Sequence, residues 1–159
     1  MDSFYSDKSY SAFLFDELEV YHAVIADLLA TISEGHGTTH THNNLGIMYW
    51  EIGEIEKARS SFSDAIEKDA TNAMAYKNLG MFEEKSGNRS DALSAFTNAV
   101  ELQPQDISIL LNNAYFLLKD NRPNDAIPFF ERAIALGCDN EIAHQKLKEA
   151  RELLLRGAT

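Results

Sequence analysis

Residues 73–106 read AMAYKNLGMFEEKSGNRSDALSAFTNAVELQPQD, and this stretch decides the fold. When the chain is aligned with itself at a shift of 34 residues, the stretch lands on residues 39–72 and on residues 107–140. Four columns then keep one residue type in all three segments: Asn44, Asn78 and Asn112; Ala58, Ala92 and Ala126; Phe62, Phe96 and Phe130; Ala65, Ala99 and Ala133. Chance does not produce such columns at one period, so the chain contains three copies of one structural unit.

The residue types in each unit predict two helices joined by a tight turn. Leu45 and Tyr49 lie four residues apart and share one face of the first helix, and the alanine and phenylalanine columns share one face of the second. The turn column holds Gly53, Gly87 and Asn121, residue types that accept a left-handed backbone at a helix end. Small residues in the columns should let the two helices approach closely, with the phenylalanine filling the space between them.

This pattern resembles the tetratricopeptide repeat (TPR) family, whose 34-residue signature combines Leu-Gly and aromatic residues in the first helix with Ala, Phe and Ala in the second. Residues 39–72 and 73–106 follow the signature closely. Residues 107–140 form a degenerate third repeat, with Asn113 in place of Leu and Cys138 in place of Pro. The resemblance implies an all-α fold, a right-handed superhelical array of antiparallel helix pairs. It implies little about function, because this fold hosts many unrelated roles.

Two further segments flank the three repeats. Residues 141–159 have the pattern of an amphipathic capping helix that would cover the third repeat. Residues 1–38 contain an apolar helix, expected at about 11–33, whose hydrophobic residues spread well past one face. Three interpretations of this helix stay open: a cap packed on the first repeat, a homodimer contact through residues 12–32, or a segment that folds into the chain's own groove and blocks it.

In this family the first helix of each repeat lines the concave side of the superhelix, so the resemblance implies a peptide-binding groove. The candidate groove residues are Asn43, Asn44, Ile47, Trp50, Lys77, Asn78, Met81, Lys85, Asn112, Tyr115, Leu118 and Lys146. The asparagine column offers a hydrogen-bond donor and an acceptor at each step, as an extended peptide backbone does in return. The alternative is that asparagine is merely common at this position or caps a neighbouring helix.

The apolar members of this set are expected to be exposed in an empty groove. Trp50, Met81, Tyr115 and Leu118 would supply apolar contact to a partner, with Leu111 among the other exposed residues. Lys77 and Lys85 would add charge. Some family members hold the acidic tails of chaperones with a two-carboxylate clamp. Here Lys77, Asn112 and Lys146 fit that pattern, and Met81 and Ile142 do not.

Composition narrows the kinds of partner. The formal net charge is −11 and the pI is about 4.8, which disfavours nucleic acid and anionic lipid as partners. Cys138 is the only cysteine, so no internal disulfide is possible, as is usual in a reducing compartment. The start of the chain lacks the order of a signal peptide, and its most apolar stretch carries several acids. We therefore expect a cytoplasmic protein without membrane insertion.

The sequence offers no chemistry for catalysis. It contains no Ser-His-Asp arrangement, phosphate-binding loop or cysteine pair, and the spacing of His36, His40 and His42 is a poor metal pattern, because helix residues two apart point in different directions. We therefore expect no enzyme activity, no cofactor and no metal. The expected function is a protein–protein interaction adaptor. The alternatives are a dedicated chaperone or neutralising partner of one secreted protein or toxin, and a structural homo-oligomer.

Overall fold

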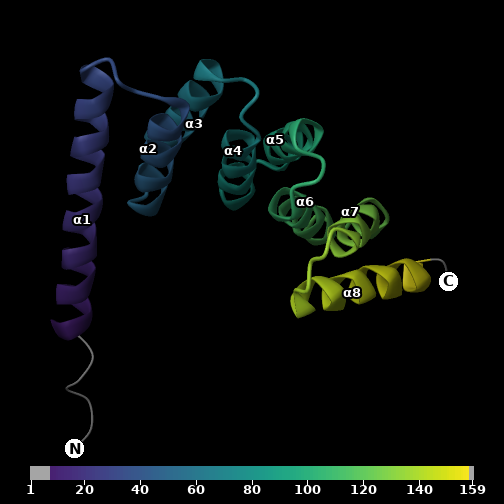
Figure 1. Cartoon of the computed structure of the whole chain (residues 1–159). Helices are drawn as coiled ribbons and strands as arrows, with labels where there is room; N and C mark the ends of the chain where they lie inside the picture. The colour runs from purple at the N-terminus through teal and green to yellow at the C-terminus, as the bar shows by residue number, and fades with distance from the viewer. Residues whose placement is uncertain (1–7, 158–159) are drawn as a thin grey trace, which may run out of the picture. The chain divides into compact units, whose positions relative to one another are not determined.

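The structure is a computed structural model that describes residues 8–157, with side chains from residue 17 to residue 156 (Figure 1). These residues form helices and no strand, which confirms the predicted all-α class. The helices are α1 (Lys8–Ser33), α2 (Thr39–Glu51), α3 (Ile55–Lys68), α4 (Ala73–Lys85), α5 (Arg89–Leu102), α6 (Ile107–Lys119), α7 (Pro123–Ala135) and α8 (Glu141–Gly157). The parts of the predicted terminal segments in residues 1–7 and 158–159 lie outside the described residues.

The helices belong to two compact units, Met1–Asp69 and Ala70–Thr159. In the first unit, α1 packs on α2, and α2 packs on α3. α1 has 26 residues and α2 has 13, so α1 is about twice as long as the helix that it packs against. α1 begins three residues before the expected start at residue 11. The side chain of Ile25 on this helix is buried.

Polar side chains fix the starts of the first helices of the repeats. At the start of α2, Thr38 and Thr41 form a capping box in which each side chain accepts from the other residue's backbone N–H. Asn72 accepts from the N–H of Ala75 at 3.1 Å. Asp106 accepts from the N–H of Ile109 at 2.9 Å, which caps α6. Each cap satisfies a backbone donor that the helix itself leaves without a partner.

The turns inside the repeats take the predicted left-handed backbone. Gly53 and Gly87 have φ values of 80° and 83°, and Asn121 has a φ of 58°. Asparagine is one of the few side chains that tolerates this region, so it can replace glycine in the third repeat.

Glycines let the two helices of a repeat approach closely. A Cβ atom on Gly46 would lie 2.8 Å from the ring of Phe62, and one on Gly80 would lie 2.9 Å from the ring of Phe96. Both rings are fully buried. The predicted close approach is therefore confirmed in the first two repeats, and the phenylalanine ring packs directly on the glycine backbone.

The second unit consists of two helix layers. α6 contacts both α4 and α8, whereas α5 and α7 make no contact with each other within residues 70–157. Each of them packs instead on the first helices: α5 on α4 and α6, α7 on α6 and α8. Because helices that are two apart along the chain touch only within the α4–α6–α8 layer, this layer lines the concave side of the second unit (Figure 1). We call it the inner layer.

Candidate peptide-binding surface

The inner layer carries most of the residues that the sequence assigned to a groove. α4 supplies Lys77, Asn78, Met81 and Lys85, α6 supplies Asn112, Tyr115 and Leu118, and α8 supplies Lys146. Two side-chain contacts join the neighbouring helices α4 and α6. Lys119 Nζ donates to Glu84 Oε1 at 2.7 Å, and Lys77 Nζ lies 3.5 Å from Ser108 Oγ.

The expected exposure is wrong for two apolar residues. Leu111 and Leu118 are each only 9% exposed and belong to the hydrophobic core of the second unit. α6 is contacted by α4, α5, α7 and α8, so side chains on several of its faces are covered. Leu118 therefore stabilises the fold and offers little surface to a partner.

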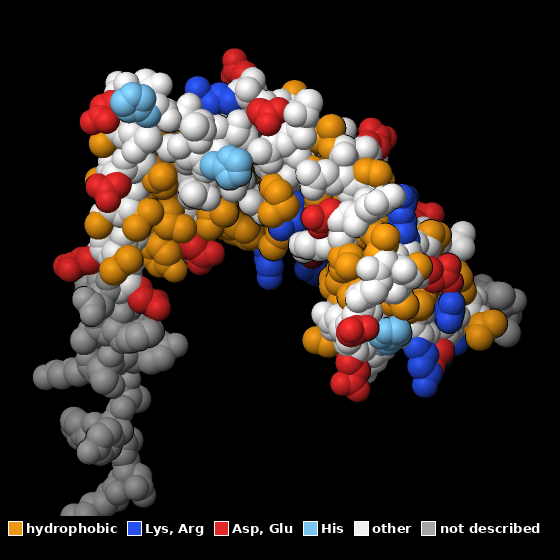
Figure 2. All heavy atoms as spheres, viewed as in Figure 1, with side chains coloured by type: hydrophobic (Ala, Val, Ile, Leu, Met, Phe, Trp, Pro, Cys, Tyr) orange, Lys and Arg blue, Asp and Glu red, His pale blue; other side chains and the backbone are white. Residues whose placement is uncertain are grey.

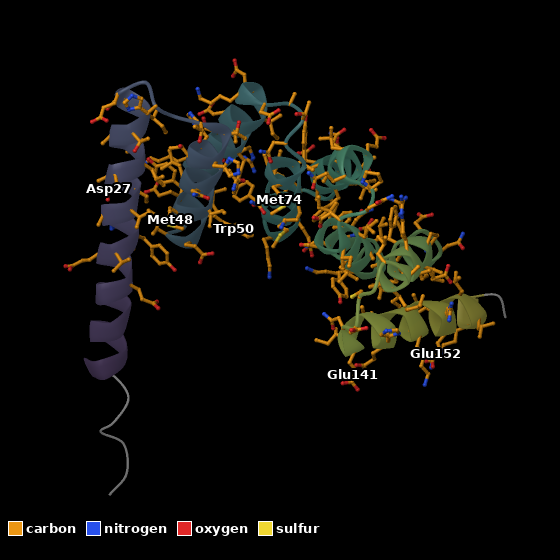
Figure 3. All side chains as sticks on the ribbon, viewed as in Figure 1. Asp27, Met48, Trp50, Met74, Glu141 and Glu152 are labelled. Carbon is orange, nitrogen blue, oxygen red and sulfur yellow. The ribbon has the colours of Figure 1, made fainter. Side chains whose placement is uncertain are left out.

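Other apolar side chains of the inner layer do reach the surface. Met81 and Tyr115 are half-buried and pack against the core, so each keeps part of its surface accessible. Met74 on α4, labelled in Figure 3, is 43% exposed, and Ile142 on α8 is 58% exposed. A thioether and an aromatic ring beside exposed aliphatic groups form an adaptable apolar surface, which suits contact with a polypeptide.

Tyr115 is held in a fixed orientation at the middle of the inner layer. Its ring packs edge-on against the ring of Phe130, with 5.3 Å between the centroids. Burial raises the pKa of the Tyr115 hydroxyl, Cys138 raises it further, and the charge of Lys146 lowers it. Tyr115 on α6 and Lys146 on α8 are therefore close enough for the ammonium charge to act on the phenol.

The predicted asparagine column is divided between the two units. Asn44 is exposed on α2 in the first unit, whereas Asn78 and Asn112 are half-buried on the inner layer of the second. Asn112 Nδ2 donates to the backbone carbonyl of Ser108 at 2.8 Å, one turn back on its own helix. The carbonyl Oδ1 of Asn112 has no hydrogen bond within residues 8–157 and can accept one from a bound peptide N–H.

The inner layer carries an excess of positive charge. Lys119 pairs with Glu84, and Lys146 pairs with Glu149, each at 2.7 Å. No described carboxylate lies within 4.0 Å of the ammonium group of Lys77 or of Lys85. Two lysines of this surface thus make no direct ion pair with a described carboxylate, in a chain whose net charge is −11.

Lys77 is the more unusual of these two cations. It is half-buried, and burial lowers the pKa of its ammonium group, while the charge of Asp106 raises it. Its hydrogen-bond partner is a neutral hydroxyl, that of Ser108. A partly desolvated ammonium group that has no direct ion pair, and only Asp106 at longer range, is a favourable position for an incoming carboxylate.

The remaining candidates lie on α2 in the first unit. Asn43, Ile47 and Trp50 are half-buried there, on the helix that α1 packs against, and Figure 3 labels Trp50. They form part of the first unit's own surface, together with the exposed Asn44.

Sequence reasoning did not identify a charged pocket at the C-terminal end of α4 and α6. Glu84, Gly87, Arg89, Phe116, Lys119 and Asp120 line it. Arg89 pairs with Asp120 at 3.2 Å, in addition to the Lys119–Glu84 pair. Each pair joins successive repeats, and within each pair the cation and the acid neutralise one another. We therefore assign this pocket a structural role. No sequence pattern marks such long-range pairs.

Other chemistry has little support among the described residues. His42 is 8% exposed, and its Nδ1 lies 3.8 Å from Asp64 Oδ2. Residues 8–157 hold no group of three or more histidine, cysteine or acidic side chains arranged to bind a metal ion. Within the same range, no helix is both long enough and apolar enough to cross a bilayer.

Family models match most of the repeat region. Residues 40–106 match the model described as YpiA-like, C-terminal tetratricopeptide repeats, and residues 83–141 match one described as tetratricopeptide repeat. No curated protein matches the chain.

Several solved structures share this fold at low sequence identity. MamA protein has a TM-score of 0.72 and 20% identity, covering 87% of this chain and 77% of its own. The first TPR of Spaghetti (RPAP3), solved with the HSP90 peptide SRMEEVD, has a TM-score of 0.68 and 17% identity, covering 74% of this chain and 94% of its own. The Arabidopsis OM64 TPR domain has a TM-score of 0.64 and 19% identity, covering 72% and 94%.

Proposed function

The chain belongs to the tetratricopeptide repeat family, and we propose that it is a non-catalytic adaptor that binds a segment of a partner protein on the inner layer. Members of this family are generally protein–protein interaction modules. The RPAP3 domain with its bound peptide supports a polypeptide ligand for this fold. The lone, buried Cys138 also agrees with a cytoplasmic site of action.

The observation that carries the proposal is the half-buried Lys77, whose ammonium group makes no ion pair within 4.0 Å with a described carboxylate, although the charge of Asp106 acts on it from further away. A surface that only had to be soluble would pair or expose this charge, since a partly buried charge costs free energy without a partner. A bound segment with a carboxylate near Lys77 would remove that cost. Met81 and Tyr115 would contact its apolar side chains, and Asn112 Oδ1 would accept a hydrogen bond from its backbone.

The complete two-carboxylate clamp is not required for this proposal. Lys77, Asn112 and Lys146 lie on three successive inner helices, but Met81 and Ile142 occupy the other two clamp positions. Lys146 is moreover paired with Glu149. The arrangement therefore supports one carboxylate contact beside an apolar surface, and a chaperone tail is a less suitable ligand than a segment of mixed composition.

Affinity capture from a lysate of the source organism, with the full chain as bait, tests this proposal. Alanine at Asn78 and Asn112 together with Lys77→Glu should reduce the captured partner at least tenfold, because three direct contacts are lost. A separate Asn44→Ala variant shows whether the first unit also contributes to binding the partner. The matched control, Ser94→Ala with Thr97→Ala on the exposed side of α5, should capture as much as the wild type. Equal capture by all variants would overturn the assignment of the inner layer.

The same capture separates the adaptor from a dedicated chaperone or neutralising partner. Several unrelated captured proteins favour an adaptor. A single captured protein whose gene lies beside that of this chain favours a dedicated chaperone of one client.

A further inference from the structure

α1 presents an outer face that no other helix of the first unit covers. Glu17, Val20, Val24 and Asp27 lie three, four and three residues apart, so they share one side of the helix. That side is roughly 120° around the helix from the buried Ile25. Val20 and Val24 are 60% and 37% exposed. Asp27 points away from α2 (Figure 3).

α8 presents a second outer face of opposite charge. Lys148, Arg151 and Leu155 lie three and four residues apart, on a side of the helix centred roughly 100° around it from the buried Leu147 and Ala150, and Arg151 lies at the border of that side, one turn after Leu147. Leu155 is 71% exposed, and the Lys148 and Arg151 side chains are 79% and 57% exposed. Figure 2 shows acidic side chains along α1, and Lys and Arg side chains interspersed with acidic ones over α8.

We propose that the outer face of α1 in one copy of the chain binds the outer face of α8 in a second copy. Single exposed apolar residues are ordinary on a protein surface. Here, however, the exposed valines of α1 are flanked by acids, in a stretch of residues 17–33 that contains no lysine or arginine. The exposed leucine of α8 has two cations, Lys148 and Arg151, and one acid, Glu152, on its side of the helix, so its surroundings are net positive. The two faces therefore match in both apolar character and charge.

The spacing of the residues allows both kinds of contact at once. Leu155 fits between Val20 and Val24, which lie one helical turn apart. At a rise of about 1.5 Å per residue, each flanking acid of α1 lies about 7.5 Å along the helix from the centre of that pair. On the same scale Arg151 lies about 6 Å from Leu155, and Lys148 about 10.5 Å. Whether the two helices run parallel or antiparallel, one acid of α1 therefore lies between Arg151 and Lys148 along the helix axis and can contact both.

The existing ion pairs of α8 do not prevent this contact. Arg151 pairs with Glu131 at 2.7 Å, and Lys148 lies 4.0 Å from Glu152. All four side chains are about half exposed or more, so these pairs contribute little and can share or exchange partners.

The same charges disfavour pairing between identical faces. Two α1 outer faces related by a twofold axis would place Glu17 opposite the second copy's Asp27, and two α8 outer faces would bring their cations together. The contact is therefore heterologous, head to tail, and can extend beyond two chains. Because two single helix faces make a small interface, we expect weak association that increases with protein concentration and decreases with salt.

Sedimentation velocity on the full chain over a range of concentrations tests the proposal. Wild-type mass should increase with concentration at low salt and fall toward the monomer at high salt. Val20→Asp and Leu155→Asp should each remain monomeric, with helix content by circular dichroism unchanged. The control Leu102→Asp, at a 37% exposed leucine outside both faces, should associate like the wild type.

The most decisive experiment mixes the two monomeric variants, Val20→Asp and Leu155→Asp. Val20→Asp keeps an intact α8 face and Leu155→Asp keeps an intact α1 face, so the mixture should form a species of two chains and no larger one. Three results would overturn the proposal: a wild type that stays monomeric at every concentration, a Leu155→Asp variant that still associates through α1 alone, or a mixture that stays monomeric.

Discussion

The second and third repeats build the same helix pair from different residues. The second repeat keeps Leu79 and Gly80, whereas the third has Asn113 and Ala114 in their places. α4–α5 and α6–α7 nevertheless both form, and Phe96 and Phe130 are both completely buried. The alanine and phenylalanine columns of the second helix are therefore sufficient for the pair when neighbouring helices supply the rest of the core.

α6 compensates for the lost signature by burying more apolar surface than α4. Its buried residues include Leu110, Leu111, Leu117 and Leu118, while those of α4 are smaller or polar apart from Phe82. The leucines of α6 meet helices on several sides. The first helix of the degenerate third repeat, α6, is thus the most enclosed helix of the second unit.

The largest expected effect comes from the phenylalanine column. Phe96→Ala and Phe130→Ala should each lower the free energy of unfolding by about 3–5 kcal/mol, because each removes a fully buried ring and leaves a cavity. Urea denaturation followed by circular dichroism measures both. If Phe130→Ala cost less than about 1 kcal/mol, the third repeat would not use this column as the second does.

Gly80→Ala should come next, with a loss of about 2 kcal/mol. The added Cβ would lie 2.9 Å from the ring of Phe96, and this clash outweighs the better helix propensity of alanine. The double variant with Phe96→Leu should lose less than the sum of the two single variants, since leucine can move away from the methyl group. Strict additivity would argue against the clash.

Asn113→Leu should stabilise the protein by about 1 kcal/mol, by restoring the residue of the other two repeats. Asn113 is 3% exposed, and its Oδ1 has no hydrogen-bond partner. Asn113→Ala serves as the control, because it also removes the buried amide but leaves a void. A destabilised leucine variant would mean that the site is too small for the leucine that the other two repeats hold.

The smallest effect is expected at the turns. Asn121→Gly should raise the free energy of unfolding by about 0.5 kcal/mol, and Gly87→Asn should lower it by a similar amount. Both positions have a positive φ, 58° and 83°, and glycine adopts it without strain. Equal stability of all three proteins would show that the turns do not distinguish the repeats.

Repeat spacing and turn residues could be predicted from the sequence because they are local and recur at one period. The burial of Leu118 could not, since it depends on how many helices surround α6. The contact of Asn112 with Ser108 also escaped prediction, because an asparagine in a helix can bond its own backbone as readily as a ligand. The lack of a direct ion pair at Lys77 became apparent only when the neighbours of the ammonium group were placed in space.

Site-specific photo-cross-linking tests the central claim, polypeptide binding on the inner layer, most directly. A benzophenone amino acid replaces Met81 on the inner layer, or Thr97 on the exposed side of α5, in the full chain incubated with lysate of the source organism. We predict that position 81 forms adducts with a partner polypeptide, that these adducts decrease with Lys77→Glu, and that position 97 forms none. Equal adducts from both positions, or adducts from position 97 alone, would contradict the account.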